Sequence, residues 1–86
     1  MPYIINIDPR GISEDIPKIQ EPYRSQINRA IMERLTTNPV GFGKPLQYSL
    51  KGFRRLRIGD WRVIYRIEGN TVQIIAIGLR RDIYED

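Results

Sequence analysis

The sequence predicts an α+β fold in the order β-α-α-β-β-β, with two helices packed on one face of a mainly antiparallel four-stranded sheet. Three observations lead to this prediction: one amphipathic helical stretch, three consecutive β-prone runs in the C-terminal half, and two-residue turns between those runs. Because 86 residues leave room for a single hydrophobic core, we expect one domain over residues 1–86.

The N-terminal half supplies the first strand and both helices. Residues 2–7 are β-prone, and Ser13, followed by two acidic residues, is typical of a helix start. Residues 22–36 give the clearest helix, because apolar side chains recur there at three- and four-residue spacing. Residues 38–52 are rich in Gly and Pro, so we expect a long surface connection.

Three strands are expected near residues 53–58, 61–67 and 71–78. The Gly-Asp and Gly-Asn turns between them tolerate positive φ, and two-residue turns also fix which residues face each other. The first hairpin is expected to pair Ile58 with Trp61, Arg57 with Arg62, Leu56 with Val63, and Arg55 with Ile64. The second is expected to pair Ile67 with Val72, Arg66 with Gln73, Tyr65 with Ile74, and Val63 with Ala76.

These pairings sort the side chains onto two faces of the sheet. The face expected under the helices is apolar and collects Leu56, Ile58, Trp61, Val63, Tyr65, Ile67, Val72, Ile74 and Ala76. The opposite face collects arginines and isoleucines, namely Arg55, Arg57, Arg62, Arg66, Ile64, Ile75 and Ile77. Like charges directly opposite each other cost stability. Either the arginine stems splay apart in solvent and cover the isoleucines, or the guanidinium groups bind a polyanion.

Charge and composition narrow the possible chemistry. Residues 44–81 carry a net charge of +7 and the remaining residues carry −3, an asymmetry that suits binding to a phosphate backbone. The chain contains neither histidine nor cysteine. This composition excludes a His-based general acid or base, a Ser-His or Cys-His nucleophile and the usual zinc ligands. We therefore expect no metal site and no cofactor.

The same features bear on location. The sequence has no run of about 18 apolar residues, so no membrane span is expected. The N-terminal residues lack the basic start and apolar run of a signal peptide. Because a small secreted domain is commonly stapled by disulfides, the absence of cysteine favours a reducing cytoplasm.

Tyr84 differs from the other aromatic residues in its position. Trp61 and Tyr65 fall among the core-facing residues and are interpreted as packing residues. Tyr84 lies past the last strand, near Arg80 and Arg81. Its ring either stacks on a nucleobase or folds over the edge of the sheet.

Two stretches resemble a known family. The run from Leu50 to Tyr65, Leu-Lys-Gly-Phe-Arg-Arg-Leu-Arg-Ile-Gly-Asp-Trp-Arg-Val-Ile-Tyr, closely resembles the RelE branch of the RelE/ParE toxins. The tail from Ile77 to Tyr84 is similar to their closing Gly-x-Arg-x-x-x-Tyr signature. The order and spacing of elements fit this family over almost the whole chain.

The resemblance implies the toxin of a type II toxin–antitoxin pair, held inactive by a RelB-like antitoxin. Toxins of the RelE type enter the A site of the small (30S) ribosomal subunit and cut mRNA there, by attack of a ribose 2′-hydroxyl on the adjacent phosphate. The catalytic residues it implies are Arg55, Arg57, Arg62, Arg80 and Tyr84. We expect four further basic residues to bind substrate, namely Lys51, Arg54, Arg66 and Arg81.

The sequence also departs from the family pattern. Arg55 and Arg57 stand where the RelE prototype has two lysines, and Leu79 stands where relatives often carry His or Lys. Arginine stays protonated in proteins, so the identity of a general base is open. Two alternatives remain: a ParE-like inhibitor of DNA gyrase, and a non-catalytic RNA-binding homologue.

Overall fold

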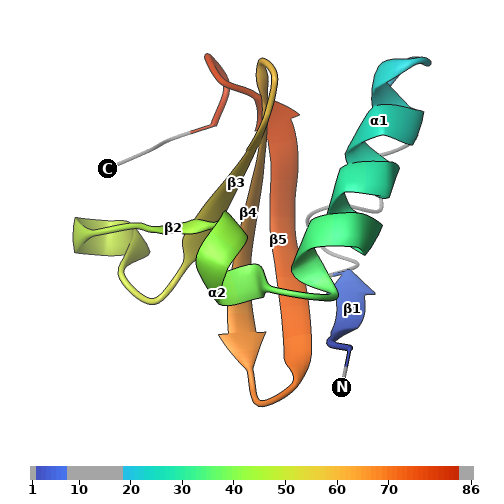
Figure 1. The fold of residues 1–86 in the computed structure, drawn as a ribbon. Coiled ribbons are helices and arrows are strands. Elements are labelled where there is room, and N and C mark those ends of the chain that lie inside the picture. The colour runs from blue at the N-terminus through green and yellow to red at the C-terminus, as the bar shows by residue number, and fades with distance from the viewer. Residues whose placement is uncertain (1, 8–18, 84–86) are drawn as a thin grey trace.

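The computed structural model describes residues 2–7 and 19–83, which form a five-stranded sheet with a helix across one face (Figure 1). The strands are β1 (Ile4–Ile7), β2 (Lys44–Pro45), β3 (Arg54–Ile58), β4 (Trp61–Glu68) and β5 (Thr71–Leu79), in the spatial order β1-β5-β4-β3-β2. Only β1 and β5 run parallel among these neighbours. The α+β prediction is confirmed, with five strands rather than four. The helix expected from Ser13 lies outside the described residues.

The helix over the sheet starts at a local network of hydrogen bonds. Helix α1 (Tyr23–Ala30) continues as the π-helical turn η2 (Ile31–Leu35), close to the predicted bounds. The Glu21 carboxylate accepts hydrogen bonds from the Ser25 hydroxyl (2.5 Å), the Arg24 Nε (3.1 Å) and the Ser25 amide (3.3 Å). These hydrogen bonds hold the pKa of Glu21 below its ordinary value, and the bond from the Ser25 hydroxyl has the largest effect.

The segment after this helix lies mostly on the surface, as predicted, but it contains short helical and strand elements that the sequence did not predict. Asn38 accepts a hydrogen bond from the Gly41 amide (3.0 Å) and starts the short helix α2 (Pro39–Phe42). Strand β2 follows and pairs with β3, which adds the fifth strand. The 3₁₀ turn η3 (Tyr48–Leu50) then leads into β3.

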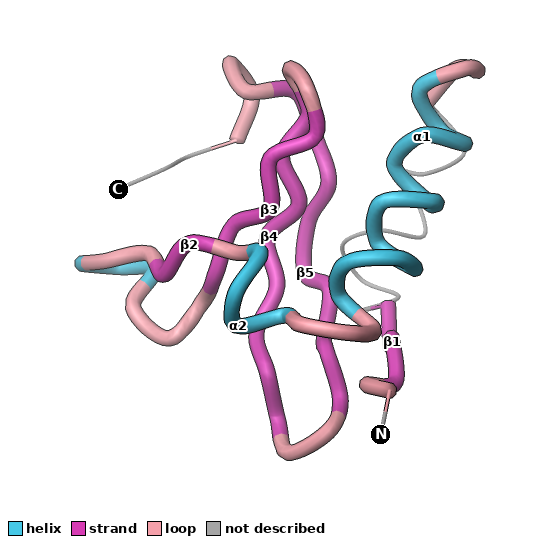
Figure 2. The backbone as a smooth tube through the Cα atoms, in the orientation of Figure 1, coloured by secondary structure: helices cyan, strands magenta, loops and turns pink. Residues whose placement is uncertain are grey.

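Helix α1 lies across one face of the sheet (Figure 2), and the core is formed between this face and the helical residues. Ile27, Ile31 and Leu35 come from the helical side, and each is almost fully buried. From the strands the core receives Leu56, Val63, Tyr65, Val72, Ile74 and Ile77. No helix in the described part of the chain is long and apolar enough to cross a membrane.

The predicted strand register holds through the first hairpin and fails within the second. All four expected pairs of the first hairpin are present. In the second, the register shifts between Ile64 and Tyr65, because Ile75 is an extra residue in β5. The predicted pairing of Val63 with Ala76 is therefore wrong, since Val63 pairs with Ile77. This shift moves Ile77 into the core, where it is 3% exposed.

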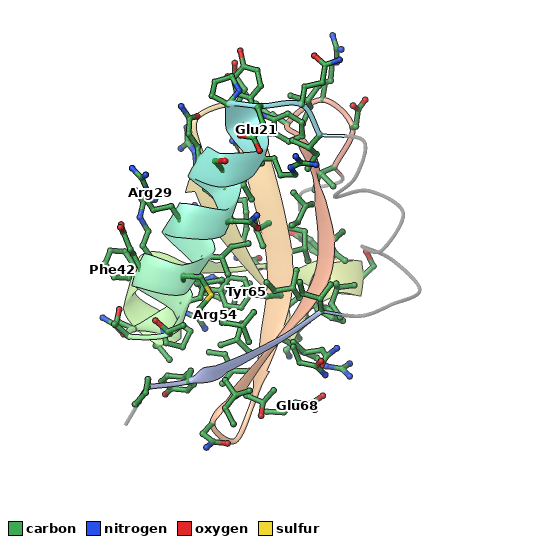
Figure 3. The ribbon with its side chains drawn as sticks, turned by 90° about the vertical axis from the view of Figure 1, so that its right-hand side faces the viewer. Glu21, Arg29, Phe42, Arg54, Tyr65 and Glu68 are labelled. Atoms are coloured by element: carbon green, nitrogen blue, oxygen red, sulfur yellow. The ribbon has the colours of Figure 1, made fainter. Side chains whose placement is uncertain are left out.

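Two side chains on the core-facing side of the sheet hold the α2 segment in place. The Tyr65 hydroxyl donates a hydrogen bond of 2.6 Å to the carbonyl oxygen of Pro39. Arg54 Nη2 donates to the carbonyl oxygens of Val40 (2.8 Å) and Gly43 (3.3 Å). Figure 3 shows Arg54 and Tyr65 close together, next to α2. Burial raises the pKa of Tyr65, although the nearby Arg54 opposes that shift.

Replacing Tyr65 by Phe should lower the free energy of unfolding by about 1–2 kcal/mol, because the buried Pro39 carbonyl loses its donor. Urea unfolding followed by circular dichroism measures this loss. The matched control is Tyr48→Phe, at a side chain that is 81% exposed, which should leave stability unchanged. Equal unfolding midpoints for the two variants would contradict this anchoring role.

Stability should fall as pH rises above about 10, the ordinary pKa of a tyrosine in an unfolded chain. Above this pH the unfolded chain loses the Tyr65 proton while the folded protein still keeps it. The contribution of Tyr65 to the free energy of unfolding is therefore complete below this pH and is lost as the pH rises above it. Unfolding free energies measured between pH 8 and pH 11 give the slope. A Tyr65→Phe variant with the same slope as the wild type would rule out this residue as the cause.

Candidate functional site

The turn between β3 and β4 places two arginines directly opposite each other, as the sequence predicts. Arg57 pairs with Arg62 on the face of the sheet away from α1. Arg55, on the same face, lies between Ile64 of β4 and Lys44 of β2. Arg57 is exposed and Arg55 is partly buried. We call Arg55, Arg57, Arg62 and Arg66 the arginine face.

Arg62 does not lie open on this face, which corrects the expectation from its strand position. It is only 3% exposed. Its Nη1 donates hydrogen bonds to the carbonyl oxygens of Gly59 (2.9 Å) and Trp61 (3.0 Å). The side chain therefore folds back toward the turn, where the guanidinium satisfies main-chain oxygens. This predicted catalytic residue is thus also part of the hairpin's structure.

Arg80 meets the same turn directly after the end of β5. Its amide donates a hydrogen bond of 2.8 Å to the carbonyl oxygen of Asp60. A cavity of about 560 Å³ opens here and is lined by Asp60, Leu79, Arg80 and Arg81. Both arginines are exposed. We call this cavity the cationic pocket.

Gly78 allows the chain after β5 to lie close against the sheet. It pairs with Arg62, and a Cβ at this position would come within 2.9 Å of Ile83 Cδ1. Main-chain bonds from the amides of Asp82 and Ile83 to the Leu79 carbonyl (2.9 and 3.1 Å) fold this segment back. The next residue, Tyr84, lies outside the described part of the chain, so its predicted role stays a prediction.

Three predicted substrate-binding residues lie apart from the turn. Arg54 belongs to the core-facing side of β3, where its guanidinium is used by the α2 segment. The alternation of side chains, which puts Arg54 on the side of Leu56, could have given this placement. Arg66 forms an exposed ion pair with Glu68 (2.6 Å). Lys51 is exposed in the turn after η3.

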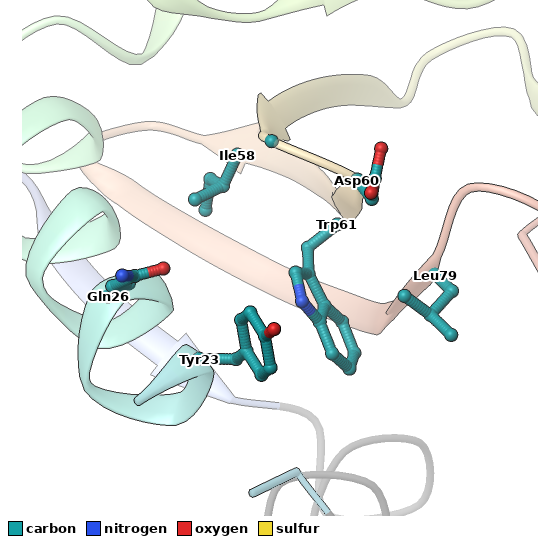
Figure 4. Close-up of a pocket in the computed structure, with 7 residues that line it drawn as sticks. Tyr23, Gln26, Ile58, Asp60, Trp61 and Leu79 are labelled. Atoms are coloured by element: carbon teal, nitrogen blue, oxygen red, sulfur yellow. The ribbon is translucent and has the colours of Figure 1, made fainter. Parts of the chain in front are cut away.

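A second cavity, of about 450 Å³, lies between α1 and the β3–β4 hairpin (Figure 4). It is lined by Tyr23, Gln26, Ile58, Gly59, Asp60, Trp61 and Leu79. We call it the aromatic pocket. Sequence reasoning missed it, because Trp61 and Tyr23 both fit the periodicity of core residues. The one available indication was the position of Trp61 at the first residue of its strand, beside an exposed turn.

The side chains near the β3–β4 turn are suited to binding an anion. In the described part of the chain, no group of three or more acidic side chains is placed to hold a metal ion, and the chain has no histidine or cysteine. The guanidinium groups of Arg57, Arg62 and Arg80 supply planar donors that match phosphate oxygens. The arrangement is suited to binding a phosphate and to stabilising negative charge on it.

A small α+β domain with arginines near one hairpin has a surface suited to binding a polyanion. The chain belongs to the family of ParE toxins of type II toxin–antitoxin systems (parDE), whose model matches residues 10–84. The resemblance to the RelE/ParE toxins is thereby confirmed.

Relatives of known name lie in the RelE branch. Toxin RelE of Mycobacterium tuberculosis is 32% identical over 74 residues, which cover 84% of this chain and 76% of that protein. Toxin RelG of the same organism is 31% identical over 86 residues, with 98% of each chain covered. This protein is therefore a type II toxin of the RelE family.

Solved structures agree with this fold. The toxin–antitoxin complex RelBE2 of M. tuberculosis contains a chain that matches with a TM-score of 0.85 and 27% identity, over 93% of each chain. The isolated RelE toxin of Escherichia coli matches with a TM-score of 0.71 and 18% identity, over 90% of this chain and 83% of that one. The RelE-like fold is thus shown.

Removing the buried guanidinium of Arg62 should destabilise the protein, whereas removing the exposed one of Arg57 should not. Arg62→Ala loses charged hydrogen bonds to two carbonyl oxygens and should cost about 2–4 kcal/mol. Arg57→Gln removes a like charge facing Arg62 and should change stability by less than about 1 kcal/mol, toward greater stability. Urea unfolding of the two variants compares them. Similar losses in both would contradict the different burial of the pair.

Proposed function

We propose that this toxin is a ribosome-dependent endoribonuclease that cleaves translated mRNA in the A site and so inhibits translation. A ribose 2′-oxygen bonds to the adjacent phosphorus as its hydroxyl proton is taken up, the P–O5′ bond breaks to leave a 2′,3′-cyclic phosphate, and water protonates the departing 5′-oxygen. The observation that carries this proposal is the convergence of Arg57, Arg62 and Arg80 on the single β3–β4 turn. Three cationic side chains that start near one turn suit a phosphate that gains negative charge during reaction.

The three arginines differ in what they can do. Arg57 is exposed and can contact the scissile phosphate directly. Arg62 is fixed by the carbonyl oxygens of the turn, so it offers a pre-oriented charge beneath the same phosphate. Arg80, at the open edge of the cationic pocket, is placed to stabilise the leaving oxygen. Arg55 extends this surface, and Arg81 adds positive charge beside the cationic pocket. Lys51 and Arg66 are proposed to contact parts of the substrate farther from the turn, and Tyr84 is proposed to stack on the substrate.

Positioning and electrostatic stabilisation supply most of the rate in this proposal. Arginine does not act as a general base at neutral pH, and the chain has no histidine. Water or a ribosomal group therefore takes the proton of the 2′-hydroxyl. Holding the 2′-oxygen in line with the phosphorus contributes through the entropy of orientation.

We extend the proposal to the partners. The RelBE2 complex of M. tuberculosis and the E. coli RelBE complex are toxin–antitoxin assemblies. By analogy, a RelB-like antitoxin neutralises this toxin in the cytoplasm by covering the arginine face with acidic side chains. The other partners are mRNA and the 30S A site. Charge complementarity between acidic and basic surfaces favours rapid association.

Inhibition of DNA gyrase is the second candidate, because the matching family model is that of the ParE toxins. The arginines gathered at the hairpin favour the nuclease. A gyrase inhibitor would cause DNA damage and leave mRNA intact, whereas the nuclease would cut message without damaging DNA.

Brief induction of the toxin should produce new mRNA 5′ ends within translated regions, mapped by primer extension with and without a translation inhibitor. Arg80→Ala and Arg57→Ala should each lower cleavage by about 10- to 1,000-fold, since each removes charge stabilisation of the transition state. Both residues are exposed, so the fold should be kept. The matched control is Arg29→Ala on α1, another exposed arginine away from the sheet, which should cleave like the wild type.

The result has three informative outcomes. Full cleavage by Arg80→Ala and Arg57→Ala would overturn the assignment of the site. DNA damage with intact mRNA would favour gyrase inhibition. Salt-sensitive RNA binding without cleavage on translating ribosomes would indicate a non-catalytic homologue.

A further inference from the structure

Building on the proposed function, we propose that the aromatic pocket is a nucleobase site. It would hold an unstacked base of the mRNA while a neighbouring phosphate occupies the cationic pocket. The substrate would then be read as an extended single strand that passes around the end of the β3–β4 hairpin.

The pocket offers aromatic surface for stacking. Tyr23 comes from the first turn of α1, and Trp61 is the first residue of β4. Their ring centroids lie 6.1 Å apart with planes inclined by 40° (Figure 4), so the rings do not cover each other face to face. Tyr23 is 49% exposed. Single-stranded RNA is commonly recognised by stacking of its bases on such rings.

The rest of the pocket matches the two kinds of surface that a base presents. Ile58 and Leu79 supply apolar walls for a flat ring. Gln26 and Asp60 supply an amide and a carboxylate that can pair with the polar edge of a base. A wholly apolar ligand would contact Ile58 and Leu79 but would leave the polar groups of Gln26 and Asp60 without hydrogen-bond partners from the ligand.

The aromatic pocket lies next to the cationic pocket, and this arrangement favours RNA as its ligand. Asp60 and Leu79 line both cavities, so the two share a wall. The far side of that wall carries the exposed guanidinium groups of Arg80 and Arg81. A cavity for an aromatic ring beside a cavity for an anion corresponds to the base and phosphate of a nucleotide chain.

Tryptophan fluorescence tests this directly, because Trp61 is the only tryptophan of the chain. A single-stranded tetranucleotide with 2′-O-methyl groups resists cleavage by 2′-hydroxyl attack and serves as the probe. It should quench the emission of Trp61 on the purified toxin. An abasic strand of equal length keeps the phosphates but lacks bases, so it should bind with little quenching.

Variants at Tyr23 separate stacking from simple packing. Tyr23→Ala should weaken binding of the tetranucleotide by about 5- to 150-fold, the usual effect of losing one base–aromatic stack. Tyr23→Phe keeps the ring and should bind like the wild type. Tyr48→Ala, at an 81% exposed aromatic residue on η3, is the matched control and should also bind normally.

Each outcome bears on the base site independently of the nuclease. Equal quenching by the abasic strand, or unchanged affinity in Tyr23→Ala, would overturn the base site even where the toxin cleaves mRNA on ribosomes. Quenching only by a RelB-like antitoxin peptide would overturn it as well and assign the pocket to that partner. Base-dependent quenching by a toxin that cleaves no message would support the site and overturn the proposed nuclease.

Discussion

The turn at Gly59 and Asp60 is the constraint on which the site depends. Gly59 adopts a positive φ of 60°, which a two-residue hairpin turn requires and which glycine adopts without steric cost. The turn fixes the register in which Arg57 meets Arg62. Its carbonyl oxygens then receive hydrogen bonds from the Arg62 guanidinium and the Arg80 amide. One short loop therefore fixes the main-chain positions of arginines in β3, in β4 and directly after β5.

The sequence predicts the parts of the structure that depend on local rules. Helix periodicity located α1 and η2, and turn chemistry with side-chain alternation gave the whole first hairpin. Strand β2 was missed because two residues in a Gly- and Pro-rich segment carry no periodic pattern. The burial of Arg62 was missed because strand alternation gives the face of a residue but not the path of a long side chain.

The same strands carry both the core and the site, so stability and binding are coupled. On β4, Val63 and Tyr65 are fully buried beneath the helix, while Arg62 and Ile64 point to the other face and are buried as well. A strand fixed on both faces gives its polar groups little freedom to move. Such rigidity suits a site that works through pre-organised charge rather than through a proton-transferring group.

The bulge in β5 shows how a small irregularity sets the geometry of this site. With continuous pairing from Tyr65 and Ile74 onward, Arg62 would face Ile77, and a branched apolar side chain would crowd its guanidinium stem. The extra residue, Ile75, advances β5 by one position, so Gly78 faces Arg62 and Ile77 enters the core. The unbroken apolar run from Ile74 to Ile77 hides this shift, because either parity buries an isoleucine. The cleared space admits the Ile83 side chain, which lies against Gly78 of β5, the residue that faces Arg62.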